Sequence, residues 1–131
     1  MRGGAAALLA SVWLAAIPAW AAETGPATVT ITGELIDLKC YVTMGLRGAI
    51  HQECAQKCAR DHWPVAVLDE QDQRLYPLVL PSASVAEAAG GHVRVTGAIV
   101  QGTDLLSPSR LEVERDGTWS DLALPTASEA Q

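Results

Sequence analysis

The sequence predicts a small, mainly β domain, and three observations support this class. Apolar residues alternate with polar ones along several short runs, as at Val93, Val95, Gly97 and Ile99, which is the period of a strand with one buried face. Turn-forming residues separate these runs, since the chain of 131 residues contains 11 Gly and 7 Pro. Only two segments have the composition of short helices, so strands dominate the expected fold.

The first strand is expected from Thr28 to Cys40, with a break in its phase. Apolar residues alternate up to Leu35 and continue on the other parity from Ile36. Because this shift lies close to Gly33, it predicts a β-bulge that bends the strand. Cys40 would then point the same way as the core residues.

The segment after this strand carries the other two cysteines. Residues 41–48 contain two glycines and show no period, which predicts a loop. Residues 49–60 lack Gly and Pro and are rich in helix-forming residues, which predicts a short helix. Pro64 cannot continue a helix and biases the preceding residue toward extended backbone. The helix is therefore expected to end by about His62.

A hairpin and a second helix are expected next. Residues 65–68 and 75–80 are apolar runs on either side of a polar stretch, which predicts two antiparallel strands. Pro77 places the second of them at a sheet edge or at a bulge, because proline donates no ladder hydrogen bond. Residues 81–89 predict a short helix that ends at a pair of glycines.

The last elements are strands. Residues 93–99 and a shorter run around Leu111 alternate in polarity, and the Asp116-Gly117 pair predicts a turn. Residues 118–124 then form a final strand or lie across the domain. Without the cysteine-bearing helix, this order is that of an OB-fold, a partly open five-stranded barrel. We therefore expect an OB-fold-like five-stranded barrel, with the cysteine-bearing helix inserted between strands one and two and a short helix between strands three and four.

Residues 1–21 predict a secretory signal peptide. Arg2 supplies the positive charge, residues 5–17 form an apolar stretch shorter than a bilayer span, and residues 19–21 have the small-x-small pattern of a cleavage site. No other segment is apolar for long enough to cross a membrane. The expected location is periplasmic or secreted, without membrane insertion after cleavage.

The rest of the chain is expected to form one OB-like domain, residues 22–124, and a flexible tail, residues 125–131. The net charge is −6, and loss of Arg2 with the signal makes it −7. Phosphate-backbone binding depends on Lys and Arg, so nucleic acid is not an expected partner. Motifs of hydrolases and of nucleotide-dependent enzymes are also missing from the sequence, so neither of these two enzyme classes has positive support.

All three cysteines lie within nineteen residues, together with a histidine. At about 100° per residue, His51, Cys54, Cys58 and His62 share an arc of about 80° on the expected helix. Cys40 can be brought opposite this arc by the intervening loop. The sequence therefore predicts that thiols and an imidazole converge on one site.

Thiolates and an imidazole suit Zn(II) or Cu(I). The three cysteines with His51 would close a tetrahedral zinc site, whereas a more open site would bind Cu(I), with Met44 as an added soft ligand. His62 is a further candidate ligand. Asp37 is expected either to hold the imidazole from behind or to be a solvated strand residue. The expected partners are a copper or zinc ion and, for metal handling, another periplasmic protein.

Other interpretations of the cysteines stay open. Cys40 with Cys54 or Cys58 would close a disulfide loop worth about 3 kcal/mol, leaving one thiol and an OB-fold binding module without metal. Cys54 and Cys58 could instead serve a thiol-disulfide redox protein, although their spacing is one residue longer than the redox C-x-x-C. The odd number of cysteines and the presence of His51 favour metal handling or a structural metal.

Residues 33–68 contain a pattern of four parts, in which h is an apolar residue. The parts are, in order, G-x-h-x-D-x-x-C, two loop glycines, H-x-x-C-A-x-x-C and x-P-h-x-h-h. This pattern resembles that of a group of short exported bacterial proteins, and it covers about a third of the mature chain. The resemblance implies a shared site without naming its ligand. Its motif positions are Asp37, Cys40, His51, Cys54 and Cys58. Where the group often has a glycine two residues before the proline, this chain has His62.

Overall fold

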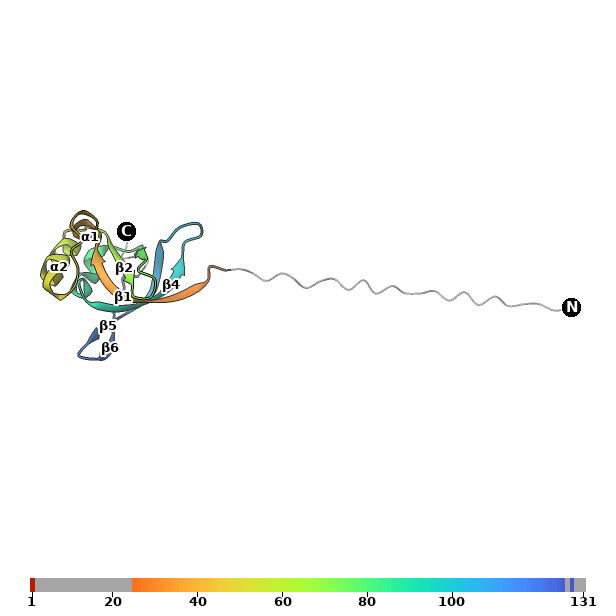
Figure 1. Ribbon diagram of the computed structural model, residues 1–131. Coiled ribbons are helices and arrows are strands. Elements are labelled where there is room, and N and C mark those ends of the chain that lie inside the picture. The colour runs from red at the N-terminus through yellow and green to blue at the C-terminus, as the bar shows by residue number, and fades with distance from the viewer. Residues whose placement is uncertain (2–24, 127, 129–131) are drawn as a thin grey trace.

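The computed structural model describes residues 25–126 and 128, together with Met1 (Figure 1). Apart from Met1, the expected signal peptide lies outside the described residues, as does most of the expected tail. Within the described part, no helix is both long enough and apolar enough to cross a membrane.

The described residues form a mainly β fold, as the sequence predicts. Six strands and four helical segments follow one another. In chain order they are β1 (Thr28–Asp37), α1 (Leu38–Met44), the 3-10 helix η1 (Ala49–His51), α2 (Gln52–Arg60), β2 (Val65–Asp69), β3 (Leu75–Pro77), the 3-10 helix η2 (Ser82–Ala88), β4 (His92–Ile99), β5 (Leu106–Arg115) and β6 (Thr118–Leu122).

The six strands form one antiparallel sheet in the order β3-β2-β1-β4-β5-β6. The five-stranded barrel expected from the sequence is not confirmed, because β3 and β6 remain the two edges of an open sheet. One parallel bridge, Leu78 to Leu106, links the chain just after β3 to β5. β3 is only three residues long and ends at Pro77, which has no N–H for a further ladder.

The cysteine-bearing helix and the second short helix have the predicted places in the chain. α2 lies between β1 and β2, and η2, a 3-10 rather than an α-helix, lies between β3 and β4. The loop predicted for residues 41–48 is wrong in its first half, because residues 41–44 belong to α1. α1 and α2 lie together at the end of the molecule opposite the first described residues of β1 (Figure 1).

The sheet has apolar residues on both faces at the end of β1. Leu35 belongs to the main core, whereas its neighbour Ile36 belongs to a second cluster with Ala66 and Leu68. The partly buried Tyr41 of α1 packs against this second cluster. The break in apolar phase therefore marks a strand covered on two sides. The predicted bulge is wrong, since β1 pairs in continuous register with β2 and with β4.

β1 contacts β2 closely at Gly33. A Cβ built on Gly33 would lie 1.9 Å from the carbonyl oxygen of Leu68. Only glycine fits this position without separating the strands, so this glycine serves strand pairing rather than a bulge.

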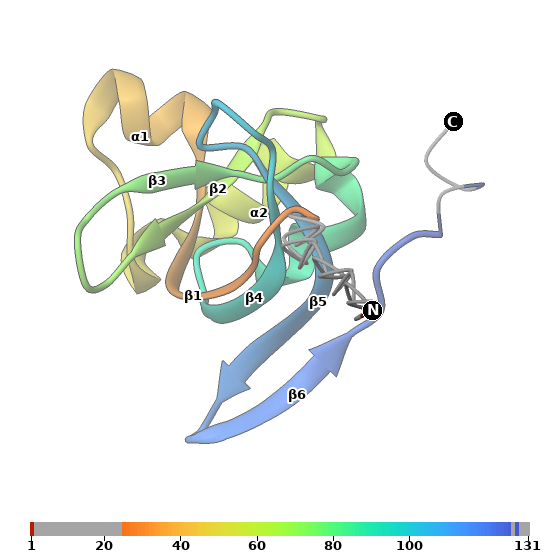
Figure 2. The same ribbon diagram turned by 90° about the vertical axis from the view of Figure 1, so that its right-hand side faces the viewer.

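The predicted turn at Asp116 and Gly117 joins β5 to β6. Both residues have positive φ, 51° and 75°, which is the backbone of a tight hairpin. β6 is the sixth strand of the sheet, and with the end of β5 it projects as a two-stranded ribbon (Figure 2). The candidate site lies elsewhere, on the helices at the other end of β1.

Candidate metal centre

Cys40 is positioned by a helix and not, as predicted, by the end of a strand. β1 ends at Asp37, whose backbone is extended and whose Oδ1 accepts a hydrogen bond of 2.8 Å from the Cys40 N–H. This is the geometry of a helix N-cap. Gly45 ends the helix in the left-handed conformation, with φ of 67°. The two caps confine α1 to seven residues and place Cys40 in its first turn.

Asp37 also holds the ring of His51. Its Oδ2 lies 3.1 Å from Nε2 of His51, and the two side chains are 1% and 9% exposed. The expectation that Asp37 is a solvated strand residue is therefore wrong. A histidine held by a carboxylate through one ring nitrogen has the other nitrogen oriented for a metal.

α2 carries Cys54 and Cys58 one turn apart, on the same face of the helix. Cys58 is buried beside the core residue Ala59, whereas Cys54 is exposed. Ser82 of η2 donates a hydrogen bond of 3.1 Å to the Ala59 carbonyl, which attaches the end of the helix to the body of the protein. Of the two thiols, only Cys54 is open to solvent.

The end of α2 is fixed by two backbone hydrogen bonds. Trp63 N–H donates to the Cys58 carbonyl at 3.0 Å and His62 N–H to the Ala59 carbonyl at 3.1 Å, which is the Schellman pattern. His62 occupies the left-handed position of this motif, with φ of 65°.

Two overlapping sets of ligand atoms result from these elements. The Sγ atoms of Cys40 and Cys54 and a ring nitrogen of His51 lie within 4.8 Å of one another. The Sγ atoms of Cys40 and Cys58 and a carboxylate oxygen of Asp37 form a second such set. Cys40 is common to both. Bonds of about 2.3 Å from a tetrahedral zinc separate two sulfurs by about 3.8 Å, so small movements of these side chains would bring the ligands to one ion.

The environment of the buried thiols favours their protonated form. Burial, then the hydrogen bond and charge of Asp37, and then Cys58 raise the pKa of Cys40 to about 12. Burial is also the main cause that raises the pKa of Cys58. A metal ion would displace these protons, because thiolates are the ligands.

The sequence-predicted residues do not all reach the site. Cys40, His51, Cys54 and Cys58 are brought together. Met44 lies at the end of α1 with its side chain exposed, and His62 is exposed beyond α2 and belongs to neither ligand set. All three cysteines are free thiols in this structure.

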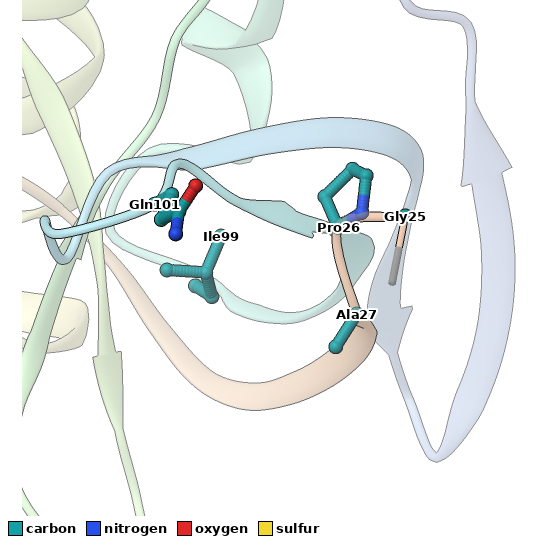
Figure 3. Close-up of a pocket in the computed structure, with 5 residues that line it drawn as sticks. All are labelled: Gly25, Pro26, Ala27, Ile99 and Gln101. Carbon is teal, nitrogen blue, oxygen red and sulfur yellow. The ribbon is translucent and has the colours of Figure 1, made fainter. Parts of the chain in front are cut away.

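A pocket of about 350 Å³ lies elsewhere, between residues 25–27 and the end of β4 (Figure 3). Its lining contains no charged side chain and one polar one, Gln101. This lining offers few of the convergent polar groups that fix a ligand, so the cysteine cluster remains the stronger candidate.

Comparisons with family models, with curated proteins and with solved structures give no match for this chain. The interpretation of the site therefore rests on its own geometry. That geometry is a cluster of thiols and an imidazole compatible with binding a metal ion.

Proposed function

We propose that this chain is an exported protein that binds one copper or zinc ion through its three cysteines and His51. The strongest support is that Cys40 belongs to two ligand sets. One set contains His51 and Cys54, and the other contains Cys58. Asp37 orients the imidazole in the manner usual for metal-bound histidines. The signal-like residues 1–21 support a periplasmic or secreted location.

The proposed site has a buried part and an accessible part. Cys40 and Cys58 are buried, while Cys54 is exposed. An ion bound here would be shielded from water where Cys40 and Cys58 bind it. Ligands from another molecule would approach it beside the exposed Cys54. This asymmetry favours a protein that acquires or hands on an ion over one that only uses the ion to fold, because structural sites are usually closed.

The redox alternative receives less support. This alternative pairs Cys54 with Cys58, and a thiol that exchanges disulfides needs a lowered pKa, whereas burial raises the pKa of Cys58. A disulfide between Cys40 and one helix cysteine is the other alternative, and thiol counting distinguishes it from metal ligation. If the protein is instead an OB-fold binding module with such a disulfide, the purified protein should contain no metal.

The direct test is elemental analysis combined with thiol counting on untagged protein purified from the periplasm of a bacterial host. We expect close to one equivalent of copper or zinc, and three titratable thiols once a chelator has removed the metal. Less than a tenth of an equivalent of any transition metal, with two thiols oxidised, would contradict the proposal. The same result would support the structural disulfide.

Single substitutions identify the ligands. Cys54→Ser, Cys58→Ser and His51→Gln should each lower the affinity of the protein for zinc or Cu(I), measured by competition with a chelator. His62→Gln is the matched control, because His62 is exposed and outside both ligand sets. An equal loss in the control variant would mean that the effect is not specific to the site.

A further inference from the structure

The segment that carries the site, residues 38–52, exposes an unusual amount of apolar surface. Val42, Met44 and Ile50 are 69%, 60% and 100% exposed, and Leu46 is exposed as well. Five other large apolar residues are exposed in the rest of the described chain: Met1, Trp63, Val79, Val100 and Leu105. Exposed apolar side chains on the segment that carries a candidate site fit a contact surface for another molecule.

This apolar surface is held in place by the body of the protein. The Gly48 N–H donates to the carboxylate of Glu34 on β1, and the Leu46 N–H to the Cys40 carbonyl at 3.4 Å. The segment begins at the Asp37 cap and continues directly into α2. Its exposed side chains therefore occupy defined positions around the site.

The charge of the segment is opposite to that of the chain. Residues 38–52 contain Lys39 and Arg47 and no Asp or Glu, whereas the chain as a whole has a net charge of −6. Lys39 lies over the Trp63 ring at 4.8 Å, and Arg47 donates a hydrogen bond of 3.5 Å to the Gln73 side-chain oxygen. Among the described residues, neither cation forms a direct ion pair with a carboxylate, although the hydrogen bond from Lys57 and, after it, the charge of Lys39 lower the pKa of Asp61. A complementary surface would therefore be acidic.

The segment also adjoins the accessible ligand. Ile50 lies in the 3-10 helix η1, which leads directly into α2, and it precedes the exposed Cys54 by four residues. A molecule that covers Ile50 would thus bring its own groups to the Cys54 thiol. The buried Cys40 and Cys58 offer no comparable approach.

We propose that the 38–52 segment is the docking surface for an acidic, metal-carrying protein that exchanges its ion through Cys54. This proposal rests on the metal-binding function proposed above and adds its partner. In the exchange, Cys54 binds the ion and gives up its thiol proton, and the displaced donor thiolate takes up a proton. The oxidation state of the ion does not change. Two cations are fewer than the four to eight typical of anionic-membrane binding, so a protein surface fits the segment better than a lipid surface.

Metal transfer from two synthetic donor peptides tests the proposal. Both donors carry zinc or Cu(I) on the same pair of cysteines, flanked by leucine and glutamate in one and by leucine and lysine in the other. Transfer to the metal-free protein is followed by stopped flow at ionic strengths of about 0.02 M and 0.5 M. We expect transfer from the acidic donor to be at least about tenfold faster at low salt, and the difference to collapse at high salt.

Variants separate docking from metal binding. Lys39→Glu combined with Arg47→Glu should reverse the preference between donors. The metal affinity of this variant is measured separately, because burial raises the pKa of Cys58 and the charge of Lys39 lowers it. Met44→Ser combined with Ile50→Ser should slow transfer from both donors. Arg74→Glu combined with Arg115→Glu is the control, since it changes the net charge equally at sites outside the segment.

Each outcome distinguishes this proposal from the function on which it rests. Equal rates for the two donors at low salt, with normal metal affinity, would overturn the docking surface and leave the metal site intact. Failure of the protein to take up metal from any source would contradict the proposed metal site itself. Binding of the metal-free protein to vesicles with about 30% anionic lipid, abolished by the Lys39 and Arg47 substitutions, would assign the segment to a membrane and overturn the proposal. A dimer that the same substitutions dissociate would assign it to a second copy of the chain.

Discussion

The carboxylate of Asp37 lies 3.1 Å from Nε2 of His51, across fourteen positions of the chain. Its other oxygen caps α1 by accepting the Cys40 N–H. One buried side chain thus fixes both the helix that carries Cys40 and the ring of the histidine. The candidate metal centre is built around this residue.

Asp37→Asn should lower the metal affinity of the protein strongly and its free energy of unfolding only slightly. Asparagine is as good an N-cap as aspartate, so α1 should persist, but the amide cannot orient the imidazole by charge. Loss of such a contact typically lowers metal affinity 10–100-fold. Competition with a chelator measures the affinity, and urea unfolding of the metal-free protein measures the stability.

Asp61→Asn is the matched control for this prediction. Asp61 is exposed and pairs with Lys57 at 2.7 Å on the outer side of α2, so its removal should leave the affinity unchanged. Asp37→Ala would remove the cap as well, at a further cost of about 1 kcal/mol in the free energy of unfolding. An affinity of Asp37→Asn within twofold of the wild type would contradict the role of Asp37.

Local sequence signals predicted most strands and both helical regions, but not the junction between β1 and α1. Leu35 and Ile36 are both buried, each in a different cluster, and periodicity alone cannot distinguish a strand covered on two sides from a bulged one. Asp37 and Gly45 do bracket α1 as N-cap and left-handed C-cap, a signal that the expectation of one long strand concealed.

The candidate site was predicted better than the element that positions it. The four-residue spacing of Cys54 and Cys58 determines that they share a helix face, which is a local property. The arrival of Cys40 at the same place depends on α1 and on the Asp37 contacts, which join residues distant in the chain. Whether a sheet stays open or closes likewise depends on long-range pairing, such as the isolated bridge from Leu78 to Leu106, for which the sequence has no local signal.

Gly33→Ala should destabilise the protein without affecting the metal ligands directly. The new Cβ would lie 1.9 Å from the Leu68 carbonyl oxygen, so β1 and β2 would have to move apart, at a cost of about 1–3 kcal/mol or more. Urea unfolding of the metal-free protein measures the loss. Gly25→Ala is the control, because nothing lies within 4 Å of its Cβ position, and an equal effect in both variants would contradict the close approach.

His92 should make the stability depend on pH. Its ring nitrogens lie 2.5 Å from Glu114 and 3.0 Å from Glu70, and the Glu114 hydrogen bond is the main cause that raises the pKa of His92 above the ordinary 6.5. The ring of Trp119 packs against it at 5.3 Å. A histidine with a raised pKa stabilises the folded state fully below 6.5, and this contribution is lost as the pH rises through the folded pKa.

The difference in unfolding free energy between the wild type and His92→Gln should therefore be larger at about pH 5.5 than at about pH 8.5. The difference should stay below about 1 kcal/mol, because the ion pairs of His92 are partly exposed. Metal-free, reduced protein is used, and the subtraction cancels the contributions of the other two histidines. A difference that grows with pH would contradict the assigned contacts.

His62→Gly should stabilise the protein while leaving its metal affinity unchanged. His62 holds a left-handed backbone, with φ of 65°, which costs an L-residue about 1–2 kcal/mol. Glycine removes this strain but loses about 0.5–1 kcal/mol through its greater freedom in the unfolded chain. The net gain in the free energy of unfolding, measured with urea, should lie between zero and about 1.5 kcal/mol. Asp116→Gly, at φ of 51° in the distant β5–β6 turn, should give a similar gain. If His62→Gly alone lowered metal affinity tenfold, His62 would be a ligand after all, and the site would have to include the end of α2.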